Sequence, residues 1–195
     1  MDHFYQKIKG FFNYEKVYDD VIKAVSENQQ EKFVEIGVWT GMSVSYAAVE
    51  IMKSGKQITL DAVDSWETAE GWTNENYLKE MVQTQNIYQQ FIDNTESVRH
   101  VINPVKMASV EASKLYGDES LFFVYIDGNH TYDFVKEDII HWLPKVKKGG
   151  YIGGHDIDNP EWPGVRQAVN EMFGEDSIKI YRLGWSDSWL YHKEI

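Results

Sequence analysis

The chain has 195 residues, a formal net charge of −12 and no cysteine, with 43% hydrophobic and 26% charged residues. This length and balance are typical of a single globular domain, residues 1–195, with a sizeable core. The negative charge argues against nucleic acid or an anionic membrane surface as partner, and the lack of cysteine excludes disulfides and thiol chemistry. No signal-peptide pattern opens the chain and no apolar run could span a bilayer, so we expect a soluble, cytoplasmic protein.

Strand and helix patterns alternate along the chain. The expected strands are 33–36, 58–64, 98–102 (stopped by Asn103-Pro104), 121–126 and 151–156, and two last β segments, 178–183 and 188–192, predict an antiparallel hairpin. Apolar residues at helical spacing predict the intervening helices, around 17–25, 44–51, 78–92, 110–116, 132–142 and 165–173. The alternation predicts a Rossmann-like, doubly wound α/β sheet, mostly parallel with a C-terminal antiparallel hairpin. N-terminal helices are expected within about 1–28, and an insertion or lid at about 65–96.

The first expected strand runs into Glu35 and is followed by Gly37 and Gly41. Glycines let a backbone approach a ligand closely, and the first amides of the next helix would face that ligand. A carboxylate at Glu35 would repel a pyrophosphate but suits a cofactor bearing an ammonium and a sulfonium group. Glu-x-Gly-x-x-x-Gly resembles the first motif of class I S-adenosylmethionine-dependent methyltransferases and differs from the Gly-x-Gly-x-x-Gly of dinucleotide binders. The alternative is an ordinary turn between a strand and a helix.

In this interpretation the turn contacts S-adenosylmethionine through Glu35, Gly37, Thr40, Gly41 and Ser43. Further acids, Asp64, Asp127 and Asp156, fall at the ends of other expected strands, where doubly wound sheets bind ligands. Asp64, with its neighbour Ser65, lies where such a fold places the acid that binds a ribose, whereas alternation puts Asp61 further back in its strand. Any one of these acids could instead be a helix N-cap.

Residues 125–156 carry the most specific pattern: Asp-Gly-x-His-x-Tyr at 127–132, Leu143-Pro144, Gly149-Gly150 and His155-Asp156. This pattern resembles small-molecule O-methyltransferases, including macrolide-sugar and aminocoumarin-sugar enzymes, with kinship to the catechol type. The resemblance covers roughly residues 30 to 160. It implies that Asp127 also contacts the cofactor. It further implies an adenine-contact turn at Met107, Ala108 and Ser109, although the family has a Gly-Asp-Ser-like sequence there.

By the same resemblance, Asp127 and Asp156 hold a divalent cation, for which we expect Mg²⁺. A hard cation held by carboxylates can bind an acceptor hydroxyl and acidify it, and His130 could accept the proton as general base. Asp127 and His130 are therefore the expected catalytic residues. Catechol-type enzymes have an Asn directly after the second metal acid, where this chain has Ile157; Glu67 is a candidate third ligand. Strand alternation predicts that His155 points away from Asp156.

The sequence thus predicts an S-adenosylmethionine-dependent O-methyltransferase that acts on a small hydroxylated acceptor, a sugar or related metabolite, assisted by a divalent cation. No nucleic-acid or membrane partner is expected, and a homodimer is left open. One alternative is a dinucleotide-dependent oxidoreductase, against which Glu35 and the missing middle glycine count. Another is a non-catalytic cofactor-binding module, against which Asp127, His130 and Asp156 count by analogy with the family.

Overall fold

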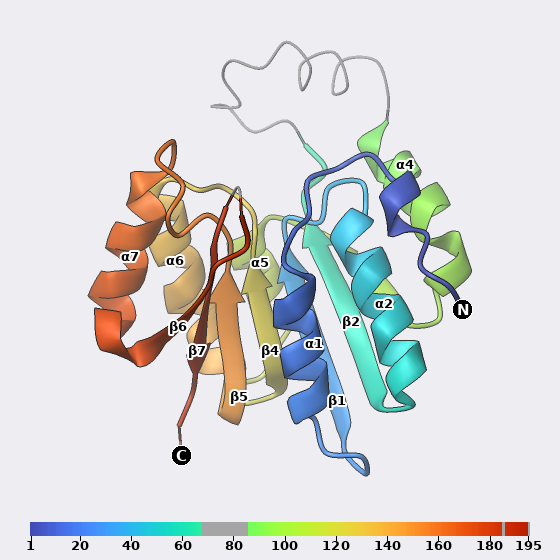
Figure 1. The fold of residues 1–195 in the computed structure, drawn as a ribbon, viewed down its shortest axis with the longest axis horizontal. Helices are drawn as coiled ribbons and strands as arrows, with labels where there is room; N and C mark the ends of the chain where they lie inside the picture. The colour runs from blue at the N-terminus through green and yellow to red at the C-terminus, as the bar shows by residue number, and fades with distance from the viewer. Residues whose placement is uncertain (68–85, 185, 195) are drawn as a thin grey trace.

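The computed structural model describes residues 1–67, 86–184 and 186–194. At its centre is a seven-stranded sheet of order β3-β2-β1-β4-β5-β7-β6 (Figure 1). Its strands are β1 (Gln30–Ile36), β2 (Gln57–Asp64), β3 (Ile102–Lys106), β4 (Leu121–Ile126), β5 (Val146–Gly154), β6 (Ile178–Tyr181) and β7 (Ser188–His192). Neighbours from β3 to β5 pair in parallel, and β7 pairs antiparallel with both β5 and β6. The predicted doubly wound sheet with its C-terminal hairpin is confirmed.

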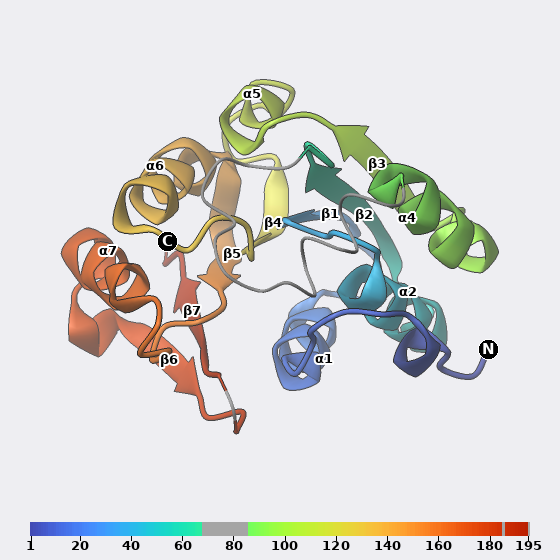
Figure 2. The same ribbon diagram turned by 90° about the horizontal axis from the view of Figure 1, so that it is seen from above.

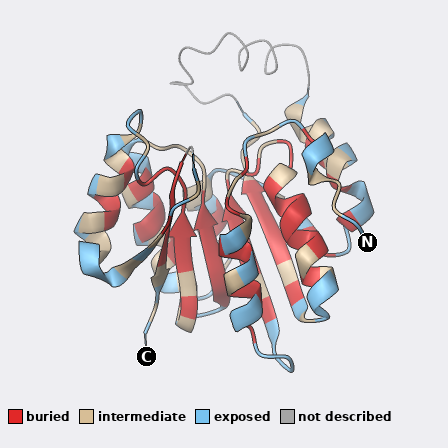
Figure 3. Ribbon diagram, viewed as in Figure 1, coloured by how far each residue is buried: buried red, intermediate tan, exposed pale blue. Residues whose placement is uncertain are grey.

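Helices cover both faces of the sheet (Figure 2). One face carries α1 (Glu15–Ala24), α2 (Met42–Ser54) and α4 (Ile87–Thr95), and the other carries α5 (Ser109–Ser113), α6 (Tyr132–Trp142) and α7 (Pro163–Phe173). Short 3-10 turns complete the described elements: η1 (Tyr5–Lys7), η2 (Glu96–Val98), η3 (Leu143–Lys145) and η4 (Glu175–Ser177). Every residue of β4 is buried, because helices pack on both of its faces (Figure 3).

Several element bounds differ from the predicted ones. The third strand was expected at 98–102 but runs from Ile102 to Lys106 and includes Asn103 and Pro104. Because β3 lies at the edge of the sheet, proline can be accommodated in it without breaking a ladder on both sides. β5 starts at Val146 and ends at Gly154, α5 is shorter than the expected helix, and β6 ends at Tyr181.

The expected lid lies largely outside the described residues, which omit 68–85. The described part of that segment ends in α4, whose N-cap Asn86 accepts a hydrogen bond from the Gln89 backbone N–H at 3.1 Å. Phe91 of this helix is fully buried in the core on the α1–α2 face. Among the described helices, none has the length and apolar character needed to cross a bilayer.

Candidate active site

The turn after β1 lies directly against the end of β4. Gly37 has a left-handed φ of 84°, and a Cβ built on it would lie 2.2 Å from the carbonyl oxygen of Asp127. Gly41, also left-handed with φ 90°, is the N-cap of α2, and a Cβ there would lie 2.8 Å from Thr95 Cγ2. Both positions therefore require glycine, for backbone conformation and for space.

Glu35 is fully buried beneath this turn and is enclosed by hydroxyl groups. The Tyr14 hydroxyl lies 3.0 Å from its Oε1, Ser43 donates to the same oxygen, and Tyr18 donates to Oε2. Burial raises the pKa of Glu35 to about 7, although the three hydroxyls favour the charged form and oppose the rise. The side chain thus joins α1 and α2 to β1, and a direct contact with the cofactor stays a prediction.

Asp64 lies at the end of β2 and contacts the same turn. Its two carboxylate oxygens accept the backbone N–H groups of Trp66 at 2.7 Å and of Trp39 at 2.9 Å. Burial raises its pKa, and these backbone amides oppose the rise. The competing Asp61 lies further back in β2, where it pairs with Lys32 and accepts from the Tyr116 hydroxyl. The structure therefore places Asp64, and not Asp61, beside the glycine turn.

The remaining predicted cofactor residues lie around these two strand ends. The Met107 backbone N–H donates to the Asp64 carbonyl at 3.0 Å, so the turn after β3 adjoins the end of β2. The Ser109 hydroxyl is engaged by α6, because it donates to Asp138 and accepts from Trp142 Nε1 at 2.9 Å. Met107 and Ala108 are exposed, Thr40 donates to the Lys9 carbonyl, and Ser65 accepts from the Glu67 N–H.

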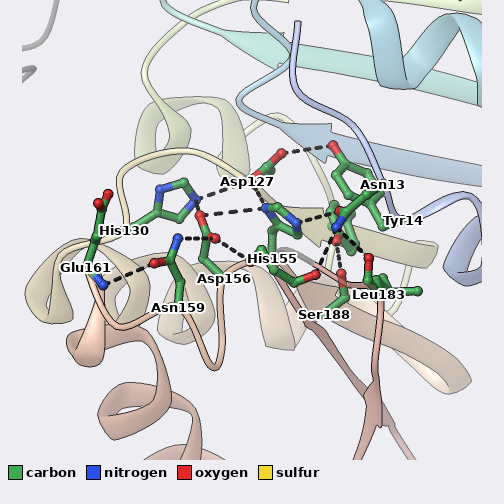
Figure 4. A network of polar contacts seen from close by, with 12 residues as sticks. Asn13, Tyr14, Asp127, His130, His155, Asp156, Asn159, Glu161, Leu183 and Ser188 are labelled. Atoms are coloured by element: carbon green, nitrogen blue, oxygen red, sulfur yellow. Dashed lines mark hydrogen bonds and ion pairs between the residues drawn. The ribbon is translucent and has the colours of Figure 1, made fainter. Parts of the chain in front are cut away.

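Four side chains converge where β4 and β5 end (Figure 4). Asp127 follows β4, His130 precedes α6, and His155 and Asp156 follow β5. His130 Nε2 lies 3.2 Å from Asp127 Oδ1 and 3.3 Å from Asp156 Oδ2. His155 Nδ1 lies 3.4 Å from that same Asp127 oxygen and 3.6 Å from that same Asp156 oxygen. One ligand atom from each of the four residues lies within 4.8 Å of the others. We call this set the Asp-His cluster.

The outward-facing atoms of the Asp-His cluster are held by neighbouring polar groups. Tyr14 donates to Asp127 Oδ2 at 2.9 Å. Asp156 Oδ1 accepts from Asn159 Nδ2 at 2.8 Å and from Ser186 Oγ at 2.5 Å. His155 Nε2 lies 2.8 Å from Asn13 Oδ1. Each of these three cluster members is thus oriented from outside, with a second polar atom facing the common centre.

Opposite charges set the protonation of the cluster. Burial alone would raise the pKa of Asp127, but His155 and His130 outweigh it and hold that pKa at about 2. Burial alone would lower the pKa of His155, but Asp127 and Asp156 outweigh it and raise the pKa. Asp127 is therefore ionised at neutral pH, and the site offers a negative charge to a cation.

One expectation about the cluster was wrong. Strand alternation predicted that His155 points away from Asp156, yet both side chains face Asp127. The reason is that β5 ends at Gly154 and that Asp156 has a left-handed φ of 59°, so the two-residue alternation does not extend through this pair. Glu67, the candidate third ligand, is exposed and is not part of the cluster.

Sequence reasoning did not find Asn13, Tyr14 or Ser186, because none of them lies in a motif. The donor set of the cluster fits a divalent cation, since two ionisable carboxylates face one centre. It departs from the oxygen ligands that Mg²⁺ prefers, because imidazole nitrogens face that centre as well.

The chain is similar to known proteins in sequence pattern and in fold. A family model described as a methyltransferase domain matches residues 34–157, and no curated protein sequence matches the chain. The fold is similar to the O-methyltransferase NovP, with a TM-score of 0.65 and 16% identity over 92% of this chain and 80% of that one. It is also similar to CalS11, a TDP-rhamnose 3'-O-methyltransferase of calicheamicin biosynthesis. The TM-score is 0.61, with 18% identity over 91% of this chain and 78% of that one. An S-adenosylmethionine-dependent O-methyltransferase from Thermotoga maritima gives a TM-score of 0.61, with 10% identity over 96% of this chain and 68% of that one.

The matched residues include the glycine turn after β1, the Asp64 strand end and the whole Asp-His cluster. They span more than half of the chain, so the match shows the family of the protein, and the cofactor contacts at the glycine turn stay a prediction. A dinucleotide-dependent oxidoreductase and a non-catalytic module both lose their support. The chain belongs to the class I S-adenosylmethionine-dependent methyltransferases and is an enzyme of that family.

Proposed function

We propose that this methyltransferase transfers the methyl group of S-adenosylmethionine to a hydroxyl of a small acceptor, a sugar or related metabolite. The observation that carries the proposal is the convergence of Asp127, His130 and Asp156 beside the glycine turn. These groups can bind a cation that acidifies an alcohol and can accept the proton that the alcohol releases. The sugar O-methyltransferase named among the similar structures supports this class of acceptor.

The cofactor is proposed to lie across the carboxyl ends of β1, β2 and β4. Gly37, Thr40, Gly41 and Ser43 would follow its amino-acid end, with Glu35 held beneath them by three hydroxyls. Asp64 and Ser65 would contact the ribose. Met107, Ala108 and Ser109 would lie along the adenine, and Asp127 would approach from β4. The contact between the Met107 N–H and the Asp64 carbonyl supports a common surface for ribose and adenine.

The chemistry then follows from the Asp-His cluster. A divalent cation at Asp127 and Asp156, for which Mg²⁺ was the expectation, would lower the pKa of the acceptor hydroxyl. His130 lies on the outer side of the cluster, with 20% of its side chain exposed, and its Nε2 faces inward to accept the hydroxyl proton. The acceptor oxygen would form a bond to the methyl carbon as the bond from that carbon to sulfur breaks, leaving S-adenosylhomocysteine. Positioning of the two reactants is the main contribution of the remaining residues.

Binding and turnover test the proposal. In isothermal titration, S-adenosylhomocysteine should bind and NADH should not. At a concentration of about 100 times its Kd, S-adenosylhomocysteine should stabilise the protein by roughly 2.7 kcal/mol in a melting experiment. Asp64→Ala and Glu35→Ala should each weaken this binding through loss of charge-assisted hydrogen bonds. With S-adenosylmethionine and a panel of hydroxylated acceptors, mass spectrometry should show one added methyl group on oxygen. Methylation only of amines or of nucleic acid would overturn the proposed acceptor.

A further inference from the structure

We infer that His155 is the third protein ligand of the cation, through Nδ1, and that the site prefers a divalent transition ion of the Fe²⁺, Co²⁺ or Zn²⁺ type over Mg²⁺. The role of the ion in catalysis rests on the proposed function, whereas the binding of the ion does not. It starts from the orientation of the His155 ring, which Asn13 determines.

The hydrogen bonds of Asn13 show which of its atoms faces His155. Its Nδ2 donates to two backbone carbonyls, that of Leu183 at 3.1 Å and that of Ser186 at 2.9 Å. Both amide protons are thereby used, so the atom 2.8 Å from His155 Nε2 is the amide oxygen, which can only accept. His155 Nε2 must therefore carry the proton of this bond, as the non-ligating nitrogen of a metal-bound histidine ordinarily does.

The other ring nitrogen faces the two carboxylates. With Nε2 protonated, Nδ1 is the ring nitrogen that can bind a metal ion, and it lies 3.4 Å from Asp127 Oδ1 and 3.6 Å from Asp156 Oδ2 (Figure 4). A divalent cation placed among these three atoms would displace any proton from Nδ1 and bind all three of them. Ligands about 2.0–2.2 Å from a tetrahedral ion lie roughly 3.3–3.6 Å apart, and the observed separations match that spacing.

The two carboxylates are held for the same purpose. Tyr14 takes the outer oxygen of Asp127, and Asn159 and Ser186 take the outer oxygen of Asp156, so one oxygen of each remains directed inward. His155 and Asp156 are only 4% and 5% exposed, so this side of the centre is closed by protein. His130 lies on the more open side, which leaves it for proton transfer and leaves His155 as the buried ligand.

The donor set then determines which ions the site should favour. Mg²⁺ binds oxygen ligands and keeps several waters, whereas an imidazole nitrogen suits Fe²⁺, Co²⁺, Ni²⁺ and Zn²⁺. A site of two carboxylates and one imidazole, with positions open on the His130 side, therefore discriminates against Mg²⁺. Substituting an oxygen ligand for His155 should remove that discrimination.

The test uses the full chain with Co²⁺ or Mg²⁺ alone, without cofactor or acceptor. Isothermal titration should give at least roughly tenfold tighter binding of Co²⁺ than of Mg²⁺. Proton NMR of the Co²⁺ form should show a paramagnetically shifted, solvent-exchangeable resonance from the His155 Nε2–H. In His155→Asp this resonance should disappear and the Co²⁺ preference should fall by roughly tenfold or more. His100→Ala, which removes an exposed histidine outside the cluster, is the control and should keep both.

Asn13→Ala provides a second variant in case His155→Asp does not fold, as judged by circular dichroism. This variant retains His155 but removes the hydrogen bond that orients its ring, and it should weaken Co²⁺ binding by roughly 10–100-fold. A shifted resonance that vanishes in His130→Ala instead, equal affinity for both ions, or binding of neither ion would overturn the inference. The last outcome would make the cluster a metal-free imidazolium–carboxylate group. Binding of S-adenosylhomocysteine, measured separately, shows whether the methyltransferase proposal itself stands.

Discussion

Two carboxylates at the ends of neighbouring strands differ in what surrounds them. The Glu35 carboxyl is enclosed by three hydroxyl groups, and burial raises its pKa to about 7. Asp127, on the adjacent β4, faces two imidazoles that overcome the same effect of burial and hold its pKa at about 2. At neutral pH, Asp127 is charged, whereas Glu35 is divided between its two forms. Burial alone therefore does not decide the role of a strand-end acid; the partner groups decide it.

Tyr14 connects these two regions. Its hydroxyl lies 3.0 Å from Glu35 Oε1 and 2.9 Å from Asp127 Oδ2, but a hydroxyl carries only one proton. The ionised Asp127 is the stronger acceptor, so Tyr14 donates to it, and a protonated Glu35 can supply the proton for the other contact. The raised pKa of one carboxyl and the lowered pKa of the other are thus compatible with a single shared hydroxyl.

The largest expected effect is on the open side of the Asp-His cluster. If His130 is the general base, His130→Ala should lower kcat by roughly 10²–10⁴-fold while the affinity for S-adenosylhomocysteine stays unchanged. His130 must be neutral to accept a proton, so the fall in rate at acid pH should also flatten in the variant. Steady-state kinetics against pH measure both effects, and the exposed His100→Ala is the control. A variant that keeps its rate but melts several degrees lower would show that His130 is structural.

The next effect tests the contact between the two regions. In Gly37→Ala, the new Cβ would overlap the Asp127 carbonyl, and the residue would retain a left-handed φ of 84°. We expect a loss of more than about 3 kcal/mol of unfolding free energy in urea. Gly55→Ala is the matched control, with a left-handed φ of 68° and no atom within 4 Å of its Cβ, so it should cost only about 1–2 kcal/mol. Equal losses in the two variants would contradict the close packing described at Gly37.

Local patterns were enough to predict much of this architecture. The apolar run at 121–126 predicted the bounds of β4, and the glycine turn predicted that a helix follows it, because burial and close approach leave direct traces in sequence. The prediction for β3 was wrong, because an edge strand tolerates the proline that would end a central strand. The prediction that Asp127, His130 and Asp156 lie together needed only the sequence motif and the order of the strands, because these residues follow two neighbouring parallel strands.

The contacts around the cluster could not be predicted in the same way. Tyr14 is 113 positions from Asp127, and Asn13 is 142 positions from His155. Such contacts depend on where the chain before α1 lies relative to the ends of β4 and β5, and hydrophobic periodicity in the sequence does not predict that position. His155 was assigned the wrong direction because alternation was applied beyond the last residue of β5.

The third prediction concerns the closed carboxyl. In the unfolded chain the pKa of Glu35 returns to its ordinary 4.5, against about 7 in the native state. Between these values the native state binds a proton that the unfolded state does not, so stability falls as pH rises through this window. The full contribution is roughly 3 kcal/mol. Glu35→Gln stays neutral, so its stability relative to the unmutated protein should improve between about pH 4.5 and 7 and then level off. Urea unfolding across pH measures this; a parallel dependence in both proteins would contradict it.

The smallest effect separates the two regions at Tyr14. Tyr14→Phe and Tyr18→Phe each remove one buried hydroxyl beside Glu35, and each should cost about 1–3 kcal/mol of stability in urea. Only Tyr14 also donates to Asp127, so only Tyr14→Phe should lower kcat/KM, by roughly 10–100-fold, as expected when a group that orients a metal ligand is lost. Tyr18→Phe is thus the matched control for the shared environment. Equal kinetic losses in both variants would mean that the enclosed Glu35, and not the bond to Asp127, transmits the effect to the active site.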